Sequence, residues 1–195
     1  MSRRPRILLW IGLFLIMGGS LRDIHSQSNS NLSSLLAAMN SFDSFRANIT
    51  LNGSLTGTLS YKRPGNLHIK FSDGRVISAN GKTLWFYSPD RGIAAKQDLK
   101  GSSSGLSGLL SGYEDISAGR SVKLKSESKR YSEISIALSE SNLPKSIRMK
   151  PSGSTESTEI IFSGIATNIG LTSSLFNFQP PSSSLIVENP LNQKE

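Results

Sequence analysis

Apolar and polar side chains alternate at every second position along most of this chain. Before this alternation begins, one stretch has apolar residues at a wider spacing. From Leu32 to Phe42, apolar residues recur every three or four positions, which predicts an amphipathic helix. From Phe45 to Leu51 they occupy every second position, which predicts the first strand. The helix has one apolar stripe and the strand has one apolar face, so each needs a partner in the fold.

The clearest strand pattern lies between positions 61 and 89. Leu67, Ile69 and Phe71 alternate with polar residues in this segment. Asn80-Gly81 is a dipeptide that can adopt positive φ at both central positions of a tight hairpin. The segment is therefore predicted to form three consecutive antiparallel strands.

Similar alternation recurs at intervals of about ten residues over the rest of the chain, which is typical of an antiparallel sheet or barrel. A turn is predicted at Gly53–Gly57, and the tail after Pro181 is predicted to be peripheral apart from its apolar residues Leu185, Ile186 and Val187. The other predicted elements are strands at 58–62, 93–99, 122–125, 134–139, 147–150 and 158–165, and a helical turn at 172–176.

Residues 100–112 interrupt the strand pattern. The segment is rich in glycine and serine, yet Leu106, Leu109 and Leu110 have helical spacing. Each glycine lowers helix propensity by about 1 kcal/mol relative to alanine, so we expect a short, marginal helix inside a flexible loop. Two interpretations stay open: a surface loop with a few buried leucines, or a mobile lid over a cavity.

Together these elements predict a mainly β fold built on one large, strongly curved antiparallel sheet. Roughly ten strands, each apolar on one face, can bury that face against helices as an incomplete, half-closed β-barrel. The N-terminal helix and the Leu106–Leu110 segment are expected to pack against the concave side as a helical lid.

The N-terminus predicts export. Three arginines within the first six residues precede the uncharged run Ile7–Gly19, which is shorter than the roughly 20 apolar residues of a spanning helix. We expect a cleaved signal peptide, with cleavage after Ser20 or Ser26 and a single domain at 27–195. A twin-arginine signal and an uncleaved anchor are the alternatives. The expected location is the periplasm.

Charge and composition exclude several classes of protein. The formal net charge is +8, and residues 1–26 carry four arginines against one aspartate, so their removal leaves +5. The densest basic group, Lys123 to Arg130, is either a solvated strand face and turn or a site of attraction to anionic headgroups or an acidic partner. The chain has no cysteine, which excludes disulfides and thiolate metal sites, and we predict no cofactor, metal or nucleic acid.

An enzyme is the main competing class. After residues 1–26 the sequence keeps one histidine, His68, on the predicted polar face of a strand, where we expect it to be exposed. No Ser-His-acid or metal-ligand spacing accompanies it, and Asp73, Asp90 and Asp98 fall at predicted turns or strand ends. We therefore expect no catalytic activity.

Two motifs carry a family resemblance. The turn Lys62-Arg63-Pro64 and the hairpin from Asn80 to Pro89, N-G-K-T-L-W-F-Y-S-P, closely resemble the LolA family of outer-membrane lipoprotein carriers. The segments Phe42–Ala47 and Phe176–Pro181 fit the same family. The resemblance implies a monomeric periplasmic chaperone that shelters lipoprotein acyl chains between the inner and outer membranes. It also implies loading by an inner-membrane ABC transporter of the lipoprotein-releasing type, with an outer-membrane acceptor as a further candidate partner.

The resemblance also assigns expected roles to residues. Arg63 matches the family arginine that hydrogen-bonds backbone carbonyls of the lid, whereas the alternative is an exposed turn arginine. Leu67 stands where the family usually has an aromatic residue. Trp85 pairs with Tyr87, and Leu84 with Phe86, and either pair can face inward. The cavity candidates share apolar character and predicted inward positions: Leu36, Met39, Phe45, Ala47, Ile49, Leu59, Tyr61, Leu67, Ile69, Phe71, Leu84, Trp85, Phe86, Leu106, Leu109, Leu110, Ile136 and Met149.

A carrier of this kind has a physical reason to exist. Burying one methylene contributes about 0.8 kcal/mol, so exposing an acyl chain of about 16 carbons to water costs roughly 12 kcal/mol. The competing non-enzymatic hypotheses are a related glycolipid-binding or lipoprotein-sensing envelope protein, and a structural envelope protein whose cavity is simply a core.

Overall fold

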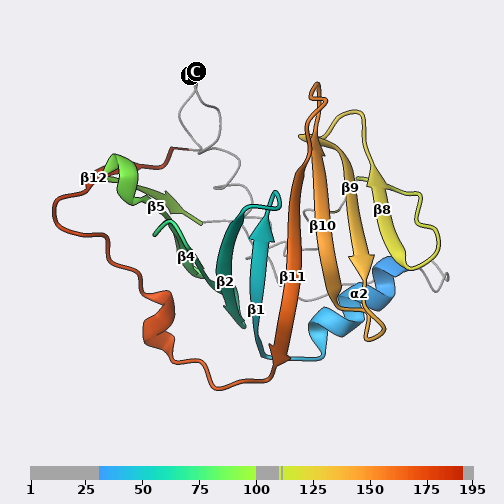
Figure 1. Ribbon diagram of the computed structural model, residues 1–195, viewed down its shortest axis with the longest axis horizontal. Coiled ribbons are helices and arrows are strands. Elements are labelled where there is room, and N and C mark those ends of the chain that lie inside the picture. The colour runs from blue at the N-terminus through green and yellow to red at the C-terminus, as the bar shows by residue number, and fades with distance from the viewer. Residues whose placement is uncertain (1–30, 100–109, 111, 191–195) are drawn as a thin grey trace.

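The computed structural model describes residues 31–99, 110 and 112–190 and shows one curved sheet with a single α-helix (Figure 1). Its twelve strands follow the order β12-β6-β5-β4-β3-β2-β1-β11-β10-β9-β8-β7, so the two ends of the sheet do not pair. All neighbours are antiparallel except β12, which runs parallel to β6. The elements are α2 Asn31–Asn40, β1 Ser44–Leu51, β2 Leu55–Lys62, β3 Asn66–Phe71, β4 Val76–Asn80, β5 Thr83–Ser88, η1 Pro89–Arg91, β6 Ile93–Asp98, β7 Glu114–Asp115, β8 Ser121–Lys125, β9 Tyr131–Leu138, β10 Pro144–Pro151, β11 Thr158–Thr167, η2 Ser173–Phe176 and β12 Leu185–Glu188.

The sequence pattern located these elements with few errors. The predicted helix, the three-strand segment and the unclosed, mainly β sheet are confirmed. Two strands are additional: β7, which is only two residues long, and β12, which extends the sheet where only a peripheral tail was expected. The turn predicted at Gly53–Gly57 was wrong in extent, because β2 already begins at Leu55. Residues 1–26 and the leucines Leu106 and Leu109 lie outside the described residues.

The concave face of β1 to β6 is largely apolar because these strands pair without a register shift, so their two-residue periods stay aligned. One row of directly paired residues crosses from β1 to β5 and a second, parallel row extends from β1 to β12. The first row is Phe45, Tyr61, Leu67, Ala79 and Leu84, and the second is Ala47, Leu59, Ile69, Ile77, Phe86, Ala95 and Val187. Except for the half-buried Val187, all of these residues are buried in one cluster.

The convex face is partly covered by the segment that connects β11 to β12. The segment after β11 crosses the convex face of β1 to β5 before it joins β12, and Figure 1 shows it in orange to red along the lower left of the molecule. The Oγ of Ser78 donates to the carbonyl of Phe176 at 3.2 Å, and Nζ of Lys62 donates to the carbonyl of Leu171 at 2.9 Å. The ring of Phe178 lies against Trp85 and Tyr87. This segment therefore forms a second, smaller apolar layer outside the sheet.

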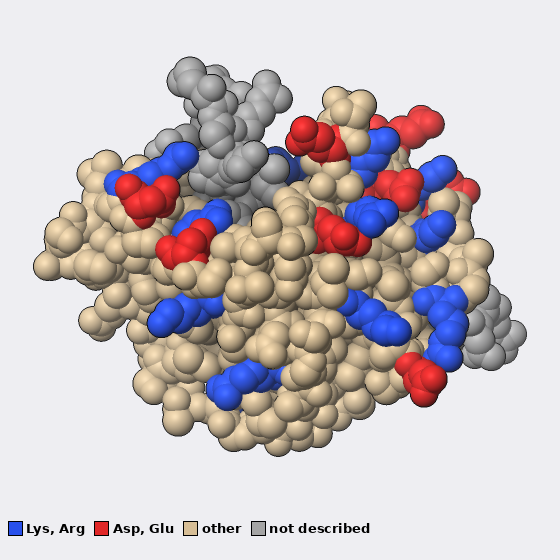
Figure 2. Space-filling view, viewed as in Figure 1, with Lys and Arg blue, Asp and Glu red and all other residues tan. Residues whose placement is uncertain are grey.

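Charged side chains are dispersed over the surface. Figure 2 shows lysine and arginine mixed with aspartate and glutamate around a broad uncharged area on the face in view. Within the part of the chain that the structure describes, no helix combines the length and the apolar character needed to cross a membrane.

Gly57 shows how tightly the concave face is filled. It lies inside β2, where it pairs with Ile49 and Phe71. A Cβ at this position would stand 2.7 Å from the carbonyl oxygen of Lys70 and 3.2 Å from the ring of Phe71. Only glycine leaves room for the Phe71 side chain to lie across the strand.

We expect Gly57→Ala to lower the free energy of unfolding by about 1–3 kcal/mol, because the backbone carbonyl of a paired strand cannot move aside easily. Chemical denaturation followed by circular dichroism measures this change. Gly170→Ala is the matched control, since nothing lies within 4 Å of its Cβ position. Equal stability of the two variants would contradict the steric role of Gly57.

Candidate functional site

The apolar candidate residues from the strands meet on the concave face. Together with Leu110 they belong to one buried cluster, and each exposes 8% or less of its surface. The predicted residues that the structure brings together are Phe45, Ala47, Ile49, Leu59, Tyr61, Leu67, Ile69, Phe71, Leu84, Phe86, Leu110, Ile136 and Met149. The sheet thus presents a large apolar surface whose residues are already covered in this structure.

Trp85 is the candidate that the structure places elsewhere. Leu84 and Phe86 face the concave cluster, so the alternation of the strand turns Trp85 and Tyr87 to the convex face. There the ring centroid of Trp85 lies 6.4 Å from that of Phe178. The assignment of Trp85 to the cavity was therefore wrong. Of the two pairs that the sequence left open, Leu84 and Phe86 face the concave side.

Helix α2 covers part of the concave face. Leu35 is the buried residue of the helix, with 2% of its surface exposed, and Leu32 and Met39 pack against the same cluster. Leu36, another candidate, is half-buried. Because neither Leu36 nor Met39 is fully buried, the helix is held less completely than the strands it covers.

The C-terminal end of α2 is tied to the turn between β2 and β3. One terminal nitrogen, Nη2, of Arg63 donates to the carbonyl of Met39 at 2.9 Å and to Oδ1 of Asn40 at 3.1 Å. The backbone N–H of Arg63 donates to the carbonyl of Asp43 at 2.8 Å. Burial raises the pKa of the neighbouring Tyr61 phenol, while the charge of Arg63 and the backbone of Gly65 act in the opposite direction. Arg63 thus bridges the sheet and the covering helix.

The N-terminal end of α2 is tied to the opposite half of the sheet. The side-chain amide of Asn31 donates to the carbonyl of Gly119 at 2.7 Å and to the carbonyl of Ser121 at 3.0 Å. Asparagine at a helix start ordinarily bonds its own first turn, so its position alone does not predict a contact with a distant strand. No local signal in the sequence pointed to a contact with β8.

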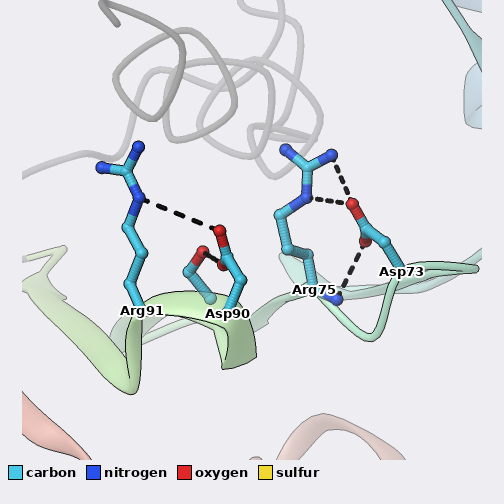
Figure 3. Close-up of polar contacts among 5 residues, drawn as sticks. Asp73, Arg75, Asp90 and Arg91 are labelled. Carbon is cyan, nitrogen blue, oxygen red and sulfur yellow. Dashed lines mark hydrogen bonds and ion pairs between the residues drawn. The ribbon is translucent and has the colours of Figure 1, made fainter. Parts of the chain in front are cut away.

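An ion pair borders the apolar cluster at the turn between β3 and β4. Nη2 of Arg75 lies 2.5 Å from Oδ2 of Asp73 (Figure 3). The guanidinium carbon of Arg75 lies 5.8 Å from the centroid of the Phe71 ring. Burial acts to raise the pKa of Asp73, but the hydrogen bonds and charge of Arg75 outweigh it and hold that pKa below its ordinary value. On the next turn Asp90 and Arg91 are mostly exposed. Asp73 thus lies in a turn, as predicted, and is paired there with Arg75.

A polar cleft of 720 Å³ lies beyond the ends of β8, β9 and β10. Glu114, Lys125, Glu133 and Lys150 form a cross-strand row of alternating charge along it. Its polar lining is unsuited to hydrocarbon.

The basic group predicted from the sequence lies on the surface. Lys123 and Lys125 are exposed on β8, and Lys129 and Arg130 are exposed in the turn that follows. The basic group is therefore accessible on a strand face and a turn, as both interpretations of the sequence require.

His68 is half-buried on the outer side of the sheet. It lies on the convex face between Ser60 and Ser78, and its Nδ1 is buried without a hydrogen-bond partner among the described residues. The expectation of an exposed side chain was wrong, because η2 packs over β3 and β4. Burial, followed by the charge of Lys70, lowers the pKa of His68. Over the described ranges, no three His, Cys, Asp or Glu residues are grouped to hold a metal.

Comparison with known proteins agrees with this architecture. Residues 44–179 match the family described as "Outer membrane lipoprotein carrier protein LolA". The chain belongs to the LolA family. The match includes every strand from β1 to β11, together with Arg63 and the convex-face segment as far as residue 179.

Two relatives and one solved structure extend the comparison. An outer-membrane lipoprotein carrier protein of Idiomarina loihiensis is 47% identical over 51 residues, covering 24% of this chain and 26% of the relative. One of Photorhabdus laumondii is 36% identical over 90 residues, covering 42% and 44%. Both matches thus span less than half of the relative's length. An uncharacterized conserved protein from Thermus thermophilus has a similar fold, with a TM-score of 0.55 at 11% identity over 82% of this chain and 99% of that chain.

The half-buried position of His68, with its Nδ1 atom buried, predicts a dependence of stability on pH. Because folding lowers its pKa, the unfolded chain binds the proton more readily, so stability is lost as pH falls below the ordinary value of 6.5. We expect the free energy of unfolding to fall between pH 7.5 and 5.5, and His68→Gln to flatten this dependence. Urea denaturation of both proteins at each pH measures it. If the free energy of unfolding of His68→Gln fell with pH as steeply as that of the wild type, His68 would not be the cause of the pH dependence.

Proposed function

We propose that this protein is a non-enzymatic periplasmic carrier that shelters lipoprotein acyl chains on its concave face during transfer from the inner to the outer membrane. The observation that carries the proposal is the combination of a continuous apolar face with a cover held by polar tethers. A face of this size needs a cover in water. A short helix that buries one residue fully and is tied at its two ends by side-chain hydrogen bonds can be exchanged for hydrocarbon without unfolding the sheet.

The energetics favour such an exchange. An acyl chain of about 16 carbons gains roughly 12 kcal/mol on leaving water, whereas a typical hydrogen bond contributes only about 0.5–1.5 kcal/mol. The free energy from one chain therefore exceeds the cost of releasing the tethers of α2. Because the closed state covers the apolar face again, the empty protein is stable and the cargo can be handed on.

Arg63 is proposed to act as the latch that favours this closed, empty state. Its guanidinium stays charged and offers several donors, and it contacts the last turn of the helix at two acceptors. Weakening this latch makes the closed, empty state less stable relative to the loaded state, so the protein retains its cargo longer. The same latch in the closed state helps to drive cargo release.

The family and the N-terminal sequence support the other parts of the proposal. Export by a signal peptide at 1–26 would place the domain at 27–195 in the periplasm, where it would act as a monomer. Its proposed partners are acylated lipoproteins and an inner-membrane ABC transporter that supplies the energy for loading. An outer-membrane acceptor is a further proposed partner.

The first test identifies the cargo. We expect protein purified from envelope extracts to carry acylated peptides that mass spectrometry of the co-eluting material detects. Free glycolipid in their place would indicate a related lipid-binding function and contradict the proposal. The absence of any bound lipid would indicate a structural protein.

A second prediction concerns the latch. We expect Arg63→Leu to take up lipoprotein normally but to deliver it about fivefold to tenfold more slowly, as the loss of hydrogen bonds from a partly exposed charged donor implies. Transfer from the loaded carrier to acceptor-containing membranes measures the rate.

Arg91→Leu is the matched control for Arg63→Leu, because Arg91 lies on an exposed turn at the other end of the sheet. Arg63→Lys should recover delivery only in part, since an ammonium lacks the planar guanidinium. Normal delivery by Arg63→Leu would refute the latch.

A further inference from the structure

Helix α2 is tied to the sheet at both ends, but the two ends are not equivalent. At its C-terminal end the chain continues through residues 41–43 directly into β1. This junction is continuous with β1 and is held beside β11, because the N–H of Asp43 donates to the side-chain Oδ1 of Asn168 and the N–H of Asn168 donates to the carbonyl of Ser44. The C-terminal end therefore stays close to the sheet even when its side-chain contacts are released.

The N-terminal end can travel much farther. A helix of ten residues is about 15 Å long at about 1.5 Å per residue, so a rotation about residues 41–43 moves Asn31 by the greatest distance along the helix. The two hydrogen bonds of Asn31 join this end to the carbonyls of Gly119 and Ser121, on the opposite half of the sheet from Arg63. In Figure 1 the helix crosses the lower ends of the strands toward β8.

We infer that Asn31 is a second latch, and that α2 opens by releasing this end first while the junction at residues 41–43 serves as the hinge. The inference rests on the proposed carrier function. Asn31 is a positioning residue that determines how often the concave face is uncovered, whereas Arg63 holds the end beside the hinge. An amide suits this role because its two N–H donors meet two backbone carbonyls without a buried charge.

The test measures the rate at which the whole protein takes up a fluorescent fatty acid of about 16 carbons by stopped flow. We expect Asn31→Ala to increase this rate by about tenfold, because the loss of two neutral hydrogen bonds raises the population of the open state. Asn40→Ala is the comparison at the hinge end of the same helix. It weakens the Arg63 latch, so we expect uptake faster than in the wild type but a smaller increase than in Asn31→Ala. It removes one contact of Arg63 and leaves the bond to the Met39 carbonyl.

A further variant separates a latch from a residue that only fills space. Asn31→Asp keeps the size of the side chain but has no donor near neutral pH and places a carboxylate against two carbonyls. We expect uptake at least as fast as that of Asn31→Ala at pH 7.5, slowing as the pH falls and the protonated acid regains one donor. A residue needed only for its shape would leave this variant at the wild-type rate at every pH.

Hydrogen exchange provides the structural readout. In Asn31→Ala we expect faster exchange at the amides of residues 32–36 and unchanged exchange in β3 to β5. Faster exchange over the whole sheet would indicate general destabilisation and would overturn the inference, as would equal uptake rates for Asn31→Ala and Asn40→Ala. If the wild-type protein takes up no fatty acid, the carrier function itself fails. Uptake by the wild type with no acceleration in Asn31→Ala refutes only the second latch.

Discussion

An unclosed, curved sheet with one apolar face cannot shelter that face by itself. A closed barrel removes the problem by pairing its first and last strands, but here β12 and β7 are the unpaired ends of the sheet. The concave side therefore needs a cover from another part of the chain. Every other feature of the molecule depends on how that cover is attached, because an apolar face that is covered reversibly is also a face that can accept hydrocarbon.

The two faces of the sheet are covered by different means. On the convex side, the segment after β11 is held by side-chain donors beneath its backbone, by aromatic contacts and finally by a strand that joins the sheet. These contacts are distributed along the segment and resist local opening. On the concave side, the tethers of α2 at Asn31 and Arg63 lie at its two ends, and Leu35 is its buried residue. The concave cover is the one whose attachment can be released at a few points.

The proposed roles of Arg63 and Asn31 follow from this difference. Both are hydrogen-bond donors to backbone carbonyls, which remain in place whatever side chains surround them. Arg63 lies beside the covalent junction with β1, whereas Asn31 lies at the far end of the helix. A carrier of this design separates the stability of the sheet, which resides in buried strand residues, from the free energy of the cover. The latter depends on the few apolar contacts of α2 and on a small number of hydrogen bonds.

The sequence by itself determined most of the fold and the composition of the concave face. Two-residue alternation places Leu67, Ile69 and Phe71 on one face whatever follows in the chain, because successive side chains of a strand point to opposite sides. The motif around Arg63 indicated the family and a latch at that position. Only the tertiary structure decided which aromatic pair of β5 faces outward, since that depends on where Phe178 lies. The partners of Asn31 are 88 and 90 residues away, and the curvature of the sheet that brings them together is not encoded in any local pattern.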